Sequence, residues 1–163
     1  MNIALIQQTM SVIITALLMA FVTPAWTQDK LANNLAIIHE QLKAEKKLIV
    51  SKYMELTESE AKQFWPVFED YQKDLLKINE RLLNLLQSYA ADYKSKSLTD
   101  EKAKKLLDDW IALEQDEVKQ RRAYASKVVQ ILPGKKAARY LQIENEYRTL
   151  LKYDLATTVP LVQ

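Results

Sequence analysis

The feature that most constrains this chain is a run of apolar residues between positions 61 and 89, spaced alternately three and four residues apart. Its members are Ala61, Phe64, Phe68, Tyr71, Leu75, Ile78, Leu82, Leu85 and Tyr89. Because a helix turns once in about 3.6 residues, this spacing places all of them on one face. The pattern is typical of a coiled-coil-like seam that continues for about four heptads. It predicts a long helix from about Glu58 to Tyr93.

The rest of the chain carries the same helical spacing in shorter stretches. It predicts one helix from Asp29 to Met54, another from Thr99 to Ile131, and a last one from about Lys135 to Leu155. One glycine and four prolines supply too few turns for a sandwich or barrel. The predicted class is therefore all-α: four helices with a long antiparallel central hairpin and coiled-coil-like packing.

Two predicted helix starts share a Leu-Thr dipeptide. Thr57 suits the N-cap position, and Glu60 then stands at N3, where its carboxylate can return to the N-cap amide as a capping box. Leu56 precedes that cap, as in a hydrophobic staple. Leu98 and Thr99 repeat the arrangement at the next helix start, with Thr99 as N-cap.

The N-terminus has the character of a secretory signal peptide. Residues 1–27 contain no charged side chain and no histidine, and an apolar run from Ser11 to Val22 precedes Thr23-Pro24-Ala25. We predict a signal peptide at 1–25, with cleavage at 25/26 or, alternatively, 27/28, and a single helical domain over 28–163. An uncleaved N-terminal anchor is the other interpretation, since the segment lacks Lys or Arg. The signal peptide predicts export to the periplasm.

Composition argues against several classes of function. The chain has no cysteine and one histidine, His39, so a metal site with several convergent ligands is not expected. The predicted signal peptide removes three of the four methionines. No nucleophile–base pair or glycine-rich phosphate loop is visible, so we expect neither an enzyme nor a cofactor. A net charge of +2 does not predict a nucleic-acid partner.

Two residues depart from the helical pattern in ways that matter. Glu117 falls on the apolar seam of the helix that begins at Thr99, so we expect it to be partly buried and paired with Arg121, Arg139 or Arg148. Trp65 lies off the seam and is a possible protein-binding residue.

Other polar and aromatic groups receive simpler interpretations. The aromatic residues Phe64, Phe68 and Tyr71 are predicted to be core. The basic stretch Lys43, Lys46 and Lys47 and the carboxylate pair Glu144 and Glu146 are predicted to lie on solvated helix faces.

A cysteine-free, all-helical, exported chain with these two Leu-Thr motifs resembles the Spy/CpxP (LTxxQ) family of periplasmic stress proteins. The motifs read LTESE at 56–60 and LTDEK at 98–102, so Glu60 and Lys102 replace the family's glutamine. The segments FWPVFEDYQ at 64–72 and LPGKKAARYLQIENEYR at 132–148 resemble a branch close to that family.

The resemblance implies a four-helix fold with a long hairpin, often assembled as a cradle-shaped dimer. It also implies an ATP-independent chaperone or an inhibitor of an envelope-stress sensor. We therefore expect protein clients, a possible homodimer, and at most peripheral membrane contact. The alternative is a structural or regulatory adaptor that docks on one envelope partner.

Overall fold

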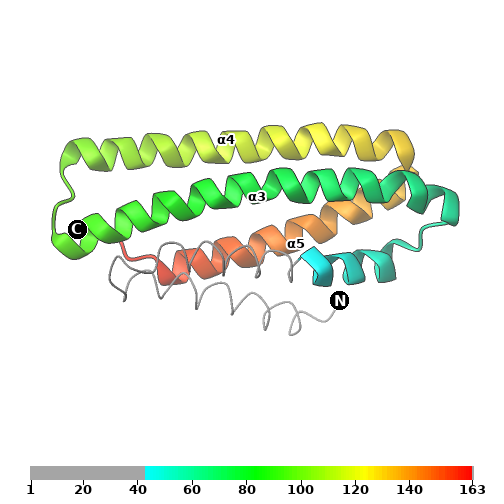
Figure 1. Cartoon of the computed structure of the whole chain (residues 1–163), viewed down its shortest axis with the longest axis horizontal. Helices are drawn as coiled ribbons and strands as arrows, with labels where there is room; N and C mark the ends of the chain where they lie inside the picture. The colour runs from blue at the N-terminus through cyan, green and yellow to red at the C-terminus, as the bar shows by residue number, and fades with distance from the viewer. Residues whose placement is uncertain (1–42, 163) are drawn as a thin grey trace.

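The structure, a computed structural model, describes residues 43–162, and every regular element within that range is a helix (Figure 1). Residues 43–54 are helical; α3 (Glu58–Ser95), α4 (Asp100–Ile131) and α5 (Gly134–Thr158) follow. Chain direction alternates from one helix to the next, and α3 and α4 pack as a long antiparallel hairpin. The prediction of an all-α fold of four helices is confirmed. The predicted signal peptide, residues 28–42 and His39 lie outside the described residues.

The two long helices begin where the sequence predicts. Thr57 Oγ1 accepts from the Glu60 N–H at 3.3 Å, and Glu60 Oε2 accepts from the Thr57 N–H at 2.7 Å, which completes the capping box. Thr99 Oγ1 accepts from the Lys102 N–H at 3.3 Å, but a lysine at N3 cannot return the bond. The helix α3 ends at Lys96, which has a φ of 53° and so the left-handed conformation common at helix C-termini.

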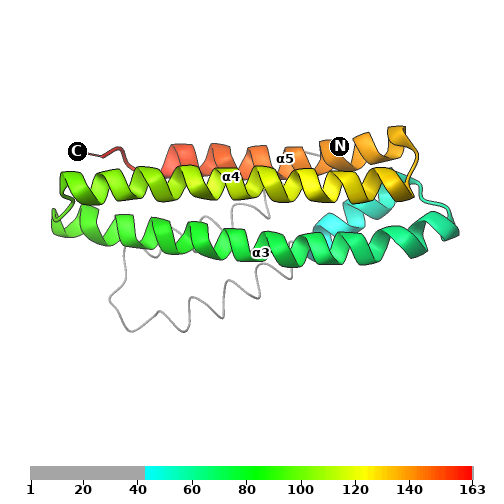
Figure 2. The same cartoon turned by 90° about the horizontal axis from the view of Figure 1, so that it is seen from above.

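The main core lies at the end of the bundle where α3 begins, and we call this the four-helix end. Figure 2 shows residues 43–54, the start of α3, the end of α4 and the start of α5 at this end. All four helices contribute buried side chains to it. Phe64 and Tyr140 meet edge to face at 5.0 Å between ring centroids, while Tyr71 and Tyr124 lie 4.8 Å apart. The buried members are Val50, Met54, Phe64, Phe68, Tyr71, Tyr124, Val128, Leu132, Ala137, Tyr140, Ile143 and Tyr147.

A smaller core occupies the opposite end, which we call the three-helix end. Leu86 and Leu155 are its buried members. Tyr89 is also buried there, and its hydroxyl donates to the Pro160 carbonyl at 2.9 Å. That bond holds the start of the C-terminal tail on α3. Leu161 beyond it is exposed.

The predicted seam of α3 is buried along its whole length, at Phe64, Phe68, Tyr71, Ile78 and Tyr89. Leu75, Leu82 and Leu85 are only half-buried. Leu86 and Ala90, which lie beside the seam, are buried as well. A straight helix advances about 20° per heptad relative to a strict 3.5-residue repeat, so side chains beside the seam also face the neighbours after a few turns.

Candidate functional site

A polar network lies buried between residues 43–54, α3 and α5. Lys46 Nζ donates to Glu144 Oε2 at 2.9 Å and to Gln72 Oε1 at 3.1 Å. Gln72 Nε2 donates to Glu144 Oε1 at 3.0 Å and closes a ring of hydrogen bonds. The three residues are 6%, 2% and 5% exposed in the order Lys46, Gln72, Glu144.

The prediction that Lys46 and Glu144 lie on solvated faces is therefore wrong. A buried charge requires a partner of opposite charge. Lys46 and Glu144 are each other's partner, although 98 positions of sequence separate them. Gln72 is also a polar exception beside the aromatic seam. Lys43 and Lys47, by contrast, are half-buried and pair with Glu69 at 3.5 and 2.7 Å.

Two tyrosines close the network from the α5 side. Lys46 Nζ lies 4.9 Å from the centroid of the Tyr147 ring, a cation–π distance. The Tyr140 hydroxyl is buried near Glu144, and its pKa is raised well above the usual value, first by burial and then by the Glu144 charge. The phenol therefore stays neutral at physiological pH.

Glu117 lies in the same region, on α4. Its side chain is 14% exposed, and its carboxylate lies 3.7 Å from both Arg148 Nε and Lys152 Nζ. Arg148 is one of the three arginines proposed from the sequence. Arg139 instead donates to a backbone carbonyl before α3, and Arg121 makes no ion pair with the described residues.

A cavity of about 130 Å³ opens among α3, α4, α5 and the start of the described chain. Its lining includes the apolar side chains of Leu75, Leu82, Trp110 and Leu151. It also includes charged groups, among them the Lys46–Glu144 pair and Glu117, and we call this charged part of the lining the charged wall. Such a combination of apolar surface and a few polar groups is the usual form of a small-molecule site.

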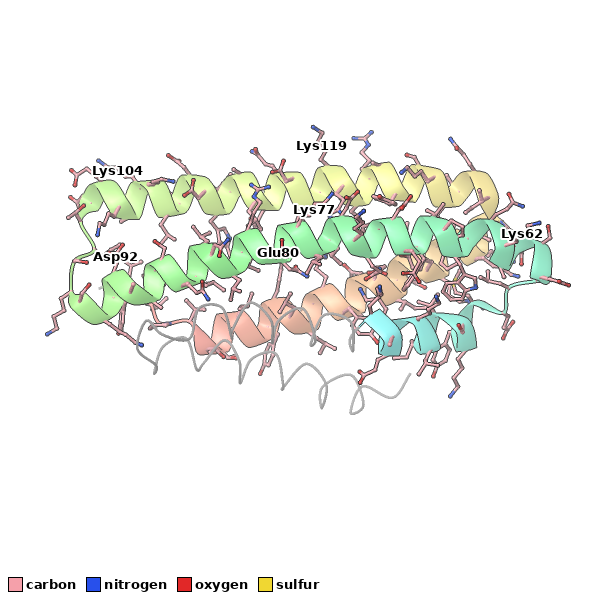
Figure 3. The ribbon with its side chains drawn as sticks, viewed as in Figure 1. Lys62, Lys77, Glu80, Asp92, Lys104 and Lys119 are labelled. Atoms are coloured by element: carbon pink, nitrogen blue, oxygen red, sulfur yellow. The ribbon has the colours of Figure 1, made fainter. Side chains whose placement is uncertain are left out.

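A second candidate is an exposed apolar stripe on α4, which the sequence analysis did not single out. Its members, with exposed fractions, are Leu107 (59%), Ile111 (45%), Val118 (52%) and Val129 (56%). Their spacing of 4, 7 and 11 residues places them within roughly 40° around the helix, about a third of a turn from the buried face. Lys104 and Lys119 also project from the side of α4 that faces away from α3 (Figure 3).

Trp65 is half-buried and packs on the main core rather than standing clear of it. Its ring meets Phe64 and Phe68 edge to face at 5.2 and 5.4 Å, and Lys47 Nζ lies 5.1 Å from its centroid. The residue is thus engaged in intramolecular contacts and does not belong to the α4 stripe. Its role in binding other proteins stays a prediction.

The remaining sequence candidates have structural roles. Leu56 packs against the main core, and Leu98 is half-buried at the start of α4. Among residues 43–162, no cluster of three or more His, Asp or Glu side chains could hold a metal ion. None of the helices in that range has the length and apolar character that a membrane span requires.

Comparison with family models, curated proteins and solved structures finds no match to this chain. The resemblance to the Spy/CpxP family therefore rests on the residues quoted above and stays a prediction.

Proposed function

We propose that this chain is an exported helical protein that binds apolar segments of other polypeptide chains through the α4 stripe, without ATP. The observation that carries the proposal is the alignment of Leu107, Ile111, Val118 and Val129 on one exposed helix face. Single exposed apolar residues are normal on a protein surface, but several of them aligned on one face of a helix favour an interaction site.

The residues beside the stripe support weak and broad binding. Lys104 and Arg122 flank it with positive charge, and Asp108 with negative charge; all three are exposed. A surface with both signs of charge can accept segments of either sign around an apolar contact. These features suit a holdase of the kind that the Spy/CpxP resemblance implies.

The experiment is aggregation suppression by the processed chain. A denatured client is diluted in the presence of stoichiometric protein without ATP, and light scattering is recorded. We expect the native chain to suppress scattering and the Ile111→Lys/Val118→Lys variant to lose most of that effect. The matched control is Leu48→Lys/Tyr153→Lys, which changes two exposed apolar residues on other helices and should retain it.

Two outcomes would count against the proposal. One is a native chain that protects none of several clients. The other is equal loss in both double variants, because a general charge effect would then explain the result rather than the α4 stripe. Melting curves of both variants show whether either has lost its fold.

Export is part of the proposal and has a separate test. Cell fractionation of the full chain should place the protein in the periplasm, and intact mass should show loss of residues 1–25 or 1–27. A full-length protein that stays in the cytosolic fraction would contradict export without affecting the binding measurement.

A further inference from the structure

The charged groups in the wall of the interhelical cavity do not all have a partner of opposite charge. Lys46 is matched by Glu144, and Lys152 lies 2.9 Å from Glu114 and 3.7 Å from Glu117. The Glu117 carboxylate also lies 3.7 Å from Arg148 Nε. These pairs involve all three carboxylates of the lining, Glu114, Glu117 and Glu144. Lys43 also lines the cavity and lies 3.5 Å from Glu69, which is not part of the lining.

Arg121 lines the same cavity and has no carboxylate at ion-pair distance among the described residues. Its Nη1 atom is buried and has no hydrogen-bond partner, and the same holds for Nε of Arg148. A guanidinium N–H can only donate a hydrogen bond. A buried donor without an acceptor therefore lowers the stability of the fold by about 1–3 kcal/mol, and by more when the group is charged. The wall therefore has one unmatched cation and two donors without acceptors.

The two arginines act on the same point of the cavity. Burial, followed by the Glu144 charge, raises the pKa of Tyr71, while the charges of Arg121 and Arg148 oppose that rise. The buried Tyr71 lines the same cavity as both arginines.

The two arginines also line a second space, on the outside of the molecule. A shallow groove on the outer surface between α4 and α5 is lined by Val118, Leu141 and Asn145, and also by Arg121 and Arg148. Because the arginines and Asn145 belong to both spaces, they form the partition between the cavity and the outside. Arginine side chains are long and flexible, so a ligand can enter by displacing them.

We infer that this cavity binds a small monocarboxylate with an apolar body. The carboxylate accepts from Arg121 and Arg148, and supplies the two acceptor oxygens and the single negative charge that the wall lacks. The apolar body lies against Leu75, Trp110 and Leu151. A cavity of about 150 Å³ holds benzene, so the 130 Å³ here suits a body of roughly six carbon atoms.

The test is calorimetric titration of the processed chain with hexanoate and benzoate, and with 1-hexanol and hexylamine as neutral and cationic counterparts. We expect the acids to bind at least roughly tenfold more tightly than the alcohol, the size of one charge-assisted hydrogen bond. The amine should not bind. Trp110 fluorescence should change on addition of the acids and should not change in Trp110→Phe.

Arg121→Gln should weaken hexanoate binding roughly tenfold or more and leave hexanol binding unchanged. The matched control is Arg122→Gln, which removes the same charge one residue along at an exposed position and should bind hexanoate like the native chain. Leu75→Trp, which fills the cavity, should abolish binding of acid and alcohol alike.

Absence of binding by either acid would overturn the inference, and so would equal affinity for hexanoate and hexanol. An equal loss of hexanoate affinity in Arg121→Gln and Arg122→Gln would show that the surface charge of the protein attracts the acid and that the cavity does not bind it. If Arg121→Gln does not fold, acid binding that Leu75→Trp leaves intact would overturn the inference as well.

Discussion

The two ends of the bundle are built differently. At the four-helix end, residues 43–54 join the other helices around a core rich in aromatic side chains, and the Lys46–Gln72–Glu144 network lies beside it. At the three-helix end, Leu86 and Leu155 are the buried members of a small aliphatic cluster among the described residues, and Leu161 in the tail is exposed. The described part of the molecule therefore has a dense end and a sparse end.

The difference indicates where stability resides and where the molecule can open. Buried apolar area is the dominant favourable term in folding, so among residues 43–162 those of the four-helix end should contribute the larger share of the free energy of unfolding. Regions with few buried contacts open first in native proteins. The cavity lies between the two ends, where dense packing gives way to partial packing.

The largest expected effect contrasts the two cores. Phe68→Ala at the four-helix end should lower the free energy of unfolding by about 3–5 kcal/mol, because it empties a fully buried site. Leu86→Ala at the three-helix end should cost about 2–3 kcal/mol, at the low end for such a change, because half-buried neighbours can relax into the space. Urea denaturation of both variants measures the difference. Equal losses would show that the ends do not differ in packing as described.

The second prediction concerns the buried network. Glu144→Leu should cost about 3 kcal/mol, because it leaves the Lys46 ammonium buried without its carboxylate. The double variant Lys46→Met/Glu144→Leu should recover most of that loss, since removing both charges also removes the cost of burying them. Denaturation midpoints of the single and double variants form the test. A double variant as unstable as Glu144→Leu alone would mean that shape, and not charge, explains the loss.

This network marks the limit of what the sequence could predict. Lys46 stands within a basic stretch and Glu144 beside Glu146, and both patterns are typical of solvated faces. What buries them is the approach of α5 to residues 43–54, a contact between segments almost 100 positions apart. No local spacing encodes such a contact. The same holds for the α4 stripe, whose exposure depends on which neighbours α4 meets.

Local chemistry, by contrast, was predictable. The capping box at Thr57 and Glu60 spans only four consecutive residues, and its hydrogen bonds form as expected. Glu117 is an intermediate case: its seam position predicted partial burial, but three arginines were possible partners. The choice of Arg148 follows from the packing of α5 against α4.

The third prediction compares helix starts at the two ends. Thr57→Ala should cost about 1–2 kcal/mol, because it removes the cap hydroxyl and weakens a box that Lys136 also supports at 2.6 Å from Glu60. Thr99→Ala should cost about 0.5–1 kcal/mol, since that cap lacks the returning carboxylate. The melting temperatures of the two variants measure this difference in stability. A larger loss for Thr99→Ala would contradict the contrast.

The smallest effects are those of two partly exposed carboxylates, Glu60 at one end and Asp92 at the other. Hydrogen bonds from Lys136 and then from the Thr57 backbone lower the pKa of Glu60, and those from Lys102 and Ser97 lower the pKa of Asp92. A lowered pKa in the folded state stabilises the protein above the unfolded pKa, and this contribution disappears as pH falls through the folded value.

Glu60→Gln and Asp92→Asn should therefore be slightly less stable than the native chain at pH 7, and the difference should vanish in acid below the folded pKa of each group. Both carboxylates are exposed enough for salt to weaken their pairs, so the two variants should lose similar small amounts. Melting temperatures of both variants between pH 7 and pH 2 measure this. Ionic contacts of this kind occur at both ends. Similar losses of melting temperature in the two variants would therefore indicate that the ends differ in their packing and not in their ion pairs. If a variant still melts below the native chain in acid, the substituted side chain contributes through its shape rather than its charge.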